Sequence, residues 1–323
     1  MTYYDQTFEP WKSVDGKCVV ADETEWKRIN RINRSAYSDY LDWVEIGGER
    51  PPRPIVKVTD IFEDVTLCPV DSRGTPIGIA DWLGDNGFGR AINHGDLITR
   101  FFRAIDSTPY VDYLIVTQHA ELVKERWPIR TGEHPCIKGI DCDRHDDFSR
   151  SNVILATYVE TQNDIERLVP QLLKCHDLCK GLAVVCNPRE ELRFDKMHEN
   201  DESIDIVDLL RGHIIDCAGG VHPMCCSVNL IIAEGNEHPM HPDHVRSLRD
   251  QCDDASVKFN FAGWGEWAPR TTHKESLTGQ DQHTAFIDGM PGDKFPEDYR
   301  MVRWGHERSG RLLDGVEHNG RLA

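Results

Sequence analysis

Residues 230–267 read LIIAEGNEHPMHPDHVRSLRDQCDDASVKFNFAGWGEW, and this stretch decides the fold class. It opens with three apolar residues, Leu230, Ile231 and Ile232, a run too short for a helix. Polar and turn-forming residues follow at positions 234–239. We therefore expect a buried strand that opens into a loop.

The same stretch continues with a helix and a second strand. Pro242 suits the first turn of a helix, and Val245, Leu248 and Cys252 fall on one face at spacings of three and four. Asp243 complements the positive end of that helix. Apolar and polar residues then alternate over 257–261, as in a strand. Strand, helix and strand in this order predict a β-α-β unit of a parallel sheet.

The rest of the chain repeats this pattern. Strands are predicted at 54–59, 113–117, 152–158 and 182–185, and helices at 98–105 and from Thr161 onward. Strands that alternate with helices are typical of α/β folds. We therefore expect a parallel (β/α) barrel, or a partial TIM-like barrel, with loop insertions at 66–95, 130–149 and 195–203. Residues 1–275 form the expected barrel domain, and residues 276–323 a C-terminal extension packed on the barrel.

Several short motifs are specific enough to indicate a family. The strongest are PMHPD at 239–243, RSLRDQC at 246–252, WGEWAP at 264–269 and GRLLDG at 310–315. Weaker ones are TFEPW at 7–11, VTDIFED at 58–64, YLIVT at 113–117 and VETQ at 159–162. In these motifs the chain resembles the phage gp thirty-seven/sixty-eight proteins. They form a family of unknown function in the radical S-adenosylmethionine superfamily, distantly like spore photoproduct lyase. The resemblance implies a barrel of the radical-SAM type.

The chain departs from this family near its start, where such proteins carry three cysteines that bind a four-iron four-sulfur cluster. Residues 12–24 read KSVDGKCVVADET and contain one thiol, that of Cys18. A cluster that also binds the cofactor needs three protein thiolates. The glycine-glycine-glutamate of the family reads Ala233, Glu234 and Gly235 here, and the family's lysine before the tryptophan motif is missing at 262–263. We expect a divergent member that has lost the cluster.

Composition limits the setting and the partners. The 323 residues carry a formal net charge of −18, which argues against nonspecific binding of nucleic acid. Residues 27–34, KRINRINR, predict a basic stripe on a short helix, which we interpret as a solvated face. The sequence shows no apolar run of the ~20 residues that cross a bilayer and no signal peptide. With an odd number of cysteines, 11, these features predict a cytoplasmic protein with reduced thiols and no membrane association, in the host cell if a phage encodes it.

Polar residues at strand ends are the candidate site, because in such barrels the loops after the strands carry the chemistry. Asp60 and Thr117 end early strands, Glu160 and Asn187 follow later ones, and Glu234 and Asn236 follow the strand at 230–232. Asp60 and Glu160 match positions of the family pattern and lead as ligand contacts, with helix capping or pairing to arginine as the alternative. The predicted ligand-binding residues are Asp60, Thr117, Glu160, Glu234, Asn236, His241, Trp264 and Glu266.

Two aromatic residues have two readings. Trp264 and Trp267 flank Glu266 and suit either a stacking platform for a base or a plug at the end of the barrel.

Metal sites are weakly indicated. Cys175, Cys179 and Cys186, and likewise Cys217, Cys225 and Cys226, lack the spacing typical of zinc or iron-sulfur ligands and suit buried small side chains better. His238, His241 and His244 recur every third residue and, with Glu237, have the residue types of a zinc site. We predict no metal site, and the sequence does not identify the catalytic residues of any enzymatic activity.

Three functions remain open. The leading hypothesis is a radical-SAM-like barrel without its cluster that keeps a strand-end pocket for a small molecule, a nucleotide or a protein partner. The first alternative is a radical-SAM-type enzyme acting on nucleic acid or a small substrate, with S-adenosylmethionine and a cluster held by Cys18 and thiols from elsewhere. The second is a zinc-dependent hydrolase or deaminase that uses His238, His241 or His244.

Overall fold

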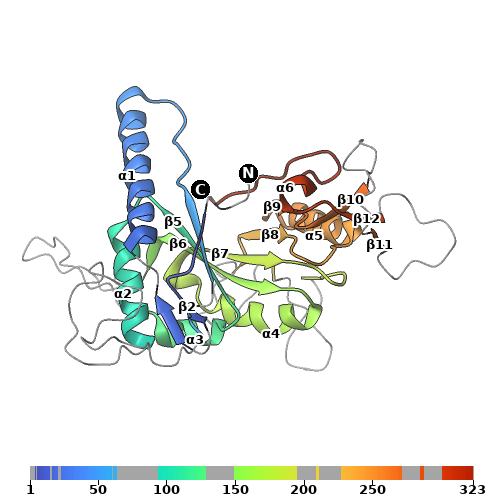
Figure 1. Cartoon of the computed structure of the whole chain (residues 1–323), viewed down its shortest axis with the longest axis horizontal. Coiled ribbons are helices and arrows are strands. Elements are labelled where there is room, and N and C mark those ends of the chain that lie inside the picture. Colours follow the sequence, from blue (N-terminus) through green and yellow to red (C-terminus); the bar gives the residue numbers. More distant parts are fainter. Residues whose placement is uncertain are drawn as a thin grey trace, which may run out of the picture. The chain divides into compact units, whose positions relative to one another are not determined.

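The fold is that of a computed structural model (Figure 1), which describes residues 4, 6–14, 17–20, 23–59, 61–63, 94–128, 149–194, 209–210, 227–270, 284–286 and 300–322. The chain divides into two compact units. Unit 1 comprises Met1–Tyr3, Ala156–His176 and Gly181–Ala323, and unit 2 comprises Tyr4–Leu155 and Asp177–Lys180. Among the described residues, no helix combines the length and the apolar character needed to span a membrane.

A seven-stranded sheet runs through the chain in the order β1-β4-β5-β6-β7-β8-β9, with β6 and β7 contributing residues to both units. The pairs β1–β4, β4–β5, β7–β8 and β8–β9 are parallel. Strands that are parallel and follow chain order are what a (β/α) fold requires. The expected α/β class with a parallel sheet is therefore confirmed.

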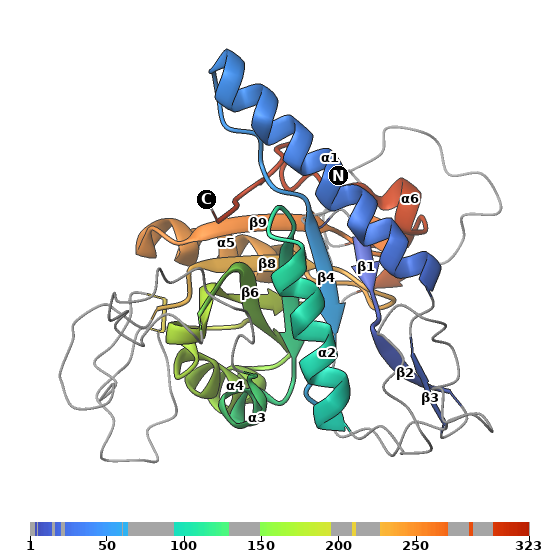
Figure 2. The same ribbon diagram turned by 90° about the vertical axis from the view of Figure 1, so that its left-hand side faces the viewer.

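Unit 2 holds the first strands and helices. They are β1 (Gln6–Phe8), the hairpin of β2 (Trp11–Val14) and β3 (Lys17–Val20), α1 (Glu23–Ile46), β4 (Ile55–Thr59), α2 (His94–Ser107), β5 (Asp112–Thr117), α3 (Ala120–Arg126) and most of β6 (Arg150–Val159). Aromatic side chains fill its core: Phe8 packs edge-on against Trp26 with ring centroids 4.4 Å apart, and both rings contact Phe101. Figure 2 shows α1 and α2 beside the strands of this unit.

Two buried charged groups of unit 2 are fully paired. Arg150, 1% exposed, donates to both carboxylate oxygens of Asp106 over 2.9 and 3.1 Å and lies over the rings of Phe102 and Trp127. Asp112 accepts from Arg53 and from Lys180 over 3.3 and 2.6 Å. A buried charge is tolerated where partners of this kind replace water, so both groups have a structural explanation.

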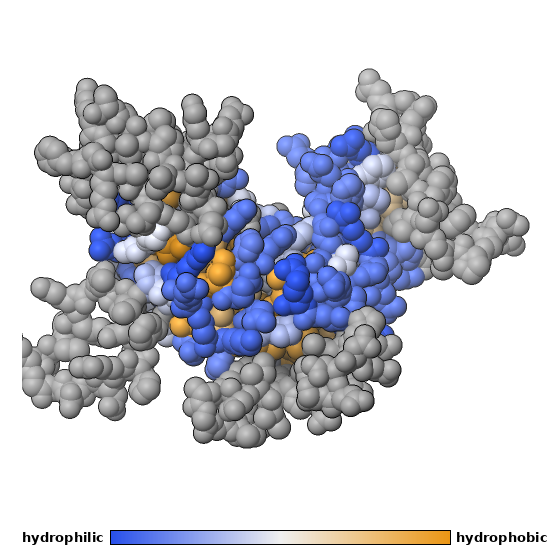
Figure 3. Space-filling view, turned by 90° about the horizontal axis from the view of Figure 1, so that it is seen from below, coloured by the Kyte–Doolittle hydropathy of each residue, from blue (hydrophilic) through white to orange (hydrophobic). Residues whose placement is uncertain are grey.

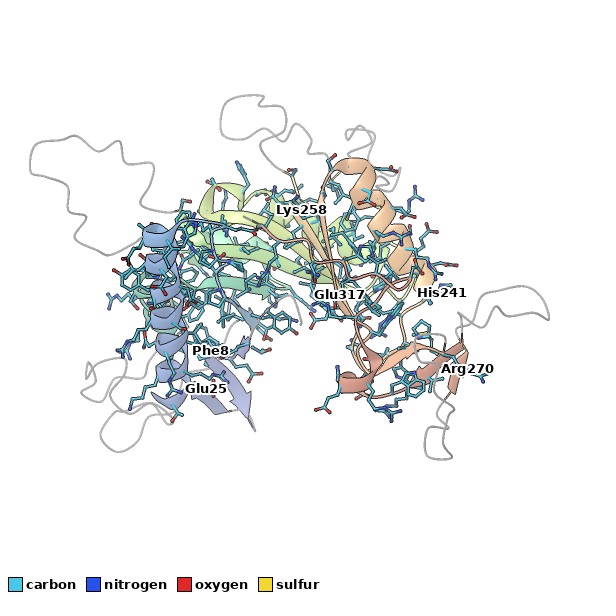
Figure 4. The ribbon with its side chains drawn as sticks, turned by 90° about the horizontal axis from the view of Figure 1, so that it is seen from above. Phe8, Glu25, His241, Lys258, Arg270 and Glu317 are labelled. Carbon is cyan, nitrogen blue, oxygen red and sulfur yellow. The ribbon has the colours of Figure 1, made fainter. Side chains whose placement is uncertain are left out.

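Unit 1 holds the later elements. They are the end of β6, α4 (Gln162–Leu173), most of β7 (Cys179–Cys186), β8 (Leu230–Glu234), α5 (Pro242–Ala255), β9 (Lys258–Gly263), β10 (Trp267–Pro269), β11 (Thr284–Phe286), β12 (Arg300–Arg303) and α6 (His306–Ser309). The predicted β-α-β unit is β8, α5 and β9, and the predicted apolar face of α5 is fully buried at Val245, Leu248 and Cys252. In Figure 4, His241 marks the start of α5.

The outer edge of β9 is covered by residues close to the C-terminus. Phe261 donates its backbone N–H to the oxygen of His318 over 3.0 Å, and Gly320 donates to Phe259 over 2.9 Å. An antiparallel bridge joins Asn260 and Asn319 between these bonds. Pairing of this kind satisfies backbone groups that an open edge would leave exposed.

The described part of the expected C-terminal extension thus attaches to the sheet of unit 1, and β12 also pairs with β10. The boundary expected between residues 275 and 276 lies outside the described residues, as do nearly all residues of the three expected loop insertions.

The other predicted elements agree with the structure to within a few residues, with one large difference. The short helix expected over 27–34 is part of α1, which has 24 residues. One face of the described surface is mostly hydrophilic with small hydrophobic areas (Figure 3), as the negative charge and low hydropathy of the chain lead us to expect.

Candidate functional site

The carboxyl ends of β6 and β7 are tied together in unit 1 just where each strand stops. The backbone N–H of Asn187 donates to the oxygen of Val159 over 3.0 Å, and that of Arg189 donates to Glu160 over 3.0 Å. Glu160 in turn precedes the N-cap of α4, Thr161. The side chains of Tyr158, Glu160 and Asn187 therefore leave from two adjoining, fixed segments.

A capping box fixes the start of α4. Thr161 accepts from the backbone of Asp164, and a carboxylate oxygen of Asp164 accepts from the backbone of Glu160 and Thr161 over 3.2 and 3.0 Å. Burial opposes the ionisation of Asp164, but these hydrogen bonds and the charge of Arg167 outweigh it and lower the pKa of Asp164. The box holds Glu160 in place at the end of β6.

Tyr158 is the centre of a polar cluster at these strand ends. Its hydroxyl donates to Oε1 of Glu160 over 3.0 Å and accepts from Nδ2 of Asn236, in the loop after β8, over 3.2 Å. Burial, helped by the nearby Glu160 carboxylate, raises the pKa of Tyr158 to about 12. The phenol is therefore neutral at physiological pH and remains a hydrogen-bond donor.

Asn187 adds an unsatisfied group to this cluster. The residue is 2% exposed, and its Nδ2 has no hydrogen-bond partner among the described residues. Its amide lies close enough to the Tyr158 hydroxyl to act on the pKa of that group, without reaching normal hydrogen-bond geometry. A buried amide donor thus lies beside the Tyr158 hydroxyl without a well-formed hydrogen bond.

Glu160 has a second partner at the surface. Its Oε2 lies 2.6 Å from Nε of Arg189, whose side chain is 52% exposed while that of Glu160 is 22% exposed. An ion pair with one exposed partner contributes little to stability. We therefore infer that the role of the ion pair is to orient the Glu160 side chain toward Tyr158.

Two glycines let the loop after β8 cross the turn after β9 at very short range. A Cβ atom on Gly235 would lie 2.1 Å from the backbone oxygen of Trp264, and one on Gly265 would lie 2.4 Å from that of Asn236. Gly235 donates to Gly263 over 2.9 Å, and Glu266 donates to Asn236 over 2.9 Å. The crossing fixes the backbone of Asn236, and with it the direction of the amide that binds Tyr158.

The start of α5 follows this loop. His241 is the N-cap, and its Nδ1 accepts from the backbone of Asp243 over 3.1 Å. The His241 ring stacks on that of His244 with centroids 4.7 Å apart. Burial lowers the pKa of both imidazoles, which favours their neutral forms. His241 therefore acts as a helix cap here.

The structure does not place the remaining predicted site residues in the Tyr158 cluster. Trp264 is 2% exposed and donates from Nε1 to Leu312 over 3.0 Å, so its ring belongs to the core of unit 1. Glu266 is ion-paired with Arg303, and Glu234 is half-buried at the end of β8. Thr117 lies in unit 2, where its hydroxyl accepts from the backbone of His119 over 2.9 Å. Asp60 lies outside the described residues.

Of the eight predicted ligand contacts, the structure brings Glu160 and Asn236 together through Tyr158. Sequence reasoning did not select Tyr158 or Arg189, and it named Asn187 only as a strand-end residue. The signal for Tyr158 was its place two residues before Glu160, because alternate residues of a strand share a face.

The described residues offer no group of three or more His, Cys, Asp or Glu side chains placed to hold a metal ion. His238, His241 and His244 are all described, and Nδ1 of His241 is engaged by a backbone N–H, so the zinc arrangement is not assembled. Cys175, Cys179, Cys186 and Cys252 are buried. Burial raises the pKa of Cys252 to about 12 and that of Cys186 as well, so both are protonated thiols.

The segment in which the resembled family carries its cluster supplies one thiol here. Cys18 lies in the β2–β3 hairpin opposite Ser13, and residues 12–24 contain no second thiol. Cys217, Cys225 and Cys226 lie outside the described residues. Three thiolates are needed for such a cluster, and this segment supplies one.

Comparison with known proteins yields one match. A family model described as "Protein of unknown function (DUF5131)" matches residues 86–321, most of the chain. No curated protein matches the chain. No solved structure matches it either.

Proposed function

Since the chain belongs to the DUF5131 family of proteins of unknown function, whose description assigns no activity, we propose a function from the geometry of unit 1. The ends of β6 and β7 and the loop after β8 bind a small polar molecule. The observation that carries the proposal is the buried, unpaired Nδ2 of Asn187 beside Tyr158. An unsatisfied buried donor costs about 1–3 kcal/mol, and a ligand atom that accepts its hydrogen bond removes that cost.

The chemistry of the cluster selects the ligand class. Asn187 requires an acceptor, such as a carbonyl oxygen or a ring nitrogen. The carboxylate of Glu160 favours amino or hydroxyl groups on the ligand and disfavours phosphate, as does the net charge of −18. An amino acid or a nucleoside carries both kinds of group.

The same proposal includes the ancestry of the site. The motifs shared with the phage gp thirty-seven/sixty-eight proteins, together with the lone Cys18, support a radical-SAM-like barrel that has lost its cluster and kept a strand-end binding site. S-adenosylmethionine and its parts are therefore the first ligands to try. An enzyme with an unconventionally held cluster is the competing reading. Stoichiometric iron and sulfide after anaerobic reconstitution of the full chain would establish that reading and overturn the loss of the cluster.

Calorimetric titration of the full chain tests the binding site. The probes are S-adenosylmethionine, S-adenosylhomocysteine, adenosine and methionine. We expect saturable binding of at least one probe, weakened tenfold or more by Asn187→Leu and by Tyr158→Phe. Glu307→Gln, an exposed change in α6, is the control and should leave binding unchanged. Equal affinity in the wild type and the Asn187 variant contradicts the proposal.

A further inference from the structure

Helix α1 carries an exposed row of side chains at alternating spacings of four and three residues. This is the spacing at which two helices pack along a common seam. Leu41, the apolar member of the row, is 45% exposed. The row consists of Lys27, Arg31, Arg34, Ser38, Leu41 and Glu45.

The other side of α1 is held by unit 2. Trp26 and Ile29 are 2% and 1% exposed, and Trp26 packs on Phe8. Asn33 accepts the backbone N–H of Tyr110 over 3.0 Å, and Tyr40 packs against the Tyr110 ring at 5.4 Å. At 3.6 residues per turn these contacts lie on a different side of the helix from the exposed row. Figure 4 labels Glu25 at the start of this helix, and its far end runs on toward the loop that leads to β4 in Figure 1.

Charge is segregated along the exposed side of α1. Arg31 and Arg34 are exposed in its first half, whereas Asp42 and Glu45 are exposed in its second half. Leu41 adds apolar surface within the row, beside the acidic residues. A partner that fits this side must therefore be acidic where α1 is basic, and basic where α1 is acidic. The same helix turned end to end has that pattern.

We propose that α1 binds α1 of a second copy of this chain in antiparallel orientation. With the crossing centred near Ala36, Arg31 of one copy lies opposite Leu41 and next to Asp42 of the other. The aliphatic part of the arginine then covers the leucine while the guanidinium meets the carboxylate. Two-fold symmetry makes each contact occur twice. A parallel pair would bring like charges together and is disfavoured.

The dimer is expected to be weak and sensitive to salt. Its ion pairs lie at the rim of a narrow seam, where added salt screens them. The net charge of −18 on each copy opposes association as well. We expect a dissociation constant in the micromolar range at low ionic strength and a loss of the dimer at high ionic strength.

Sedimentation velocity of the full chain at low salt tests this proposal. The wild type should rise from 36.9 kDa to twice that mass with concentration. Arg31→Glu and Asp42→Arg, each alone, should weaken the dimer tenfold or more. An equimolar mixture of the two variants should restore it, because each symmetric contact then joins a glutamate to an arginine or an aspartate to an arginine.

Two matched substitutions of exposed leucines test whether dimerisation depends on the α1 row or on exposed apolar surface in general. Leu41→Ser should weaken the dimer, whereas Leu312→Ser, at 43% exposure elsewhere on the chain, should not. All of the substituted residues are exposed, and unchanged melting temperatures will show that the variants fold. A wild type that stays at 36.9 kDa at every concentration, or a mixture no more dimeric than its components, overturns the proposal.

Discussion

Asn236 donates from Nδ2 to the hydroxyl of Tyr158 across 3.2 Å, although 78 positions separate the two residues in the sequence. The bond joins the loop after β8 to the end of β6 within unit 1. It also leaves the Tyr158 proton directed at Glu160. The cluster is thus partly organised before any ligand binds, and its unsatisfied member, Asn187, can be tested by itself.

Replacement of Asn187 by leucine should stabilise the free protein. The substitution removes a buried unpaired amide and keeps a side chain of similar size, so we expect the free energy of unfolding to rise by about 1 kcal/mol. Denaturant unfolding of the ligand-free protein measures this change. Asn152→Leu is the matched control, because Nδ2 of Asn152 donates to three backbone oxygens in unit 2.

The control variant should lose about 1–3 kcal/mol, since leucine removes all three hydrogen bonds that the Asn152 amide donates. If Asn187→Leu is destabilising to a similar degree, the Asn187 amide is satisfied in solution, and the case for a ligand at that position fails.

The ionisation of Tyr158 should be displaced to high pH. Its pKa is raised to about 12 in the folded chain, mainly by burial, against about 10 when unfolded. A raised pKa favours the protonated folded state. This contribution to stability is present below about pH 10 and is lost as pH rises toward 12. The free energy of unfolding of Tyr158→Phe should therefore fall less than that of the wild type as pH rises from about 10 to about 12.

Ultraviolet titration of the two proteins isolates the transition. The difference between their curves should contain one phenol that ionises near pH 12, while other tyrosines, including the deeply buried Tyr113, cancel. A difference curve centred near pH 10 would show that Tyr158 is solvated and that the cluster is open in solution.

Disruption of the capping box should destabilise unit 1 and make it less sensitive to acid. Thr161→Ala removes the hydroxyl that accepts from the backbone of Asp164, at an expected cost of about 1 kcal/mol. Because the pKa of Asp164 is lowered in the folded chain, its contribution is present above the unfolded value and is lost as pH falls through the folded value.

Asp164→Asn should accordingly be destabilising at neutral pH and nearly neutral in strong acid. Thermal melts of both proteins from neutral pH to pH ~3 will check this. An identical loss at every pH would mean that the Asp164 charge plays no part in the box.

Gly235→Ala should be among the most damaging small substitutions in the chain. The added Cβ meets a backbone oxygen 2.1 Å away, and relief requires the two crossing segments to separate. We expect a loss of more than about 2 kcal/mol, and a weaker Tyr158–Asn236 contact. Gly47→Ala, just after the end of α1, is the control: its φ is +82° but its Cβ enters open space, so only backbone strain of about 1 kcal/mol applies. Equal losses in the two variants would show that the close approach is not maintained in solution.

The fold could be predicted wherever the signal was local. The β-α-β unit was predicted within a few residues, because Pro242 marks the helix start and Val245, Leu248 and Cys252 mark its buried face. Thr161 likewise identified the start of α4. Each of these signals depends on neighbours within one or two turns of chain, for which the rules of capping and periodicity are sufficient.

Contacts between distant segments could not be predicted in this way. No local pattern shows that residues 318–320 pair with β9, since the short polar run around Asn319 forms a bridge only when a free strand edge is beside it. The length of α1 was missed because its second half is held by aromatic contacts with Tyr110 and not by an apolar stripe. Cys175 and Cys179 are four residues apart, a spacing typical of one helix face, but Cys179 is the first residue of β7.

The sequence predicted two residues of the candidate site but not the role of the buried residue between them. Glu160 and Asn236 follow from the rule that ligands lie at strand ends, whereas the importance of Asn187 depends on which of its hydrogen bonds are made. Trp264 shows the opposite case. The motif around it suggested a ligand surface as readily as a plug, and only its 2% exposure and its bond to Leu312 place it in the core.

The close crossing of the backbone at Gly235 and Gly265 restricts which sequence changes this protein can accept during evolution. Each backbone occupies the space that a side chain on the other would need, so neither segment can lengthen or shift alone. Substitutions at the two positions are therefore expected to covary among related sequences. Insertions between these glycines and the adjoining strands are expected to be removed by selection. Diversification of the site is then left to the side chains carried by this frame, such as those at positions 158, 187 and 236.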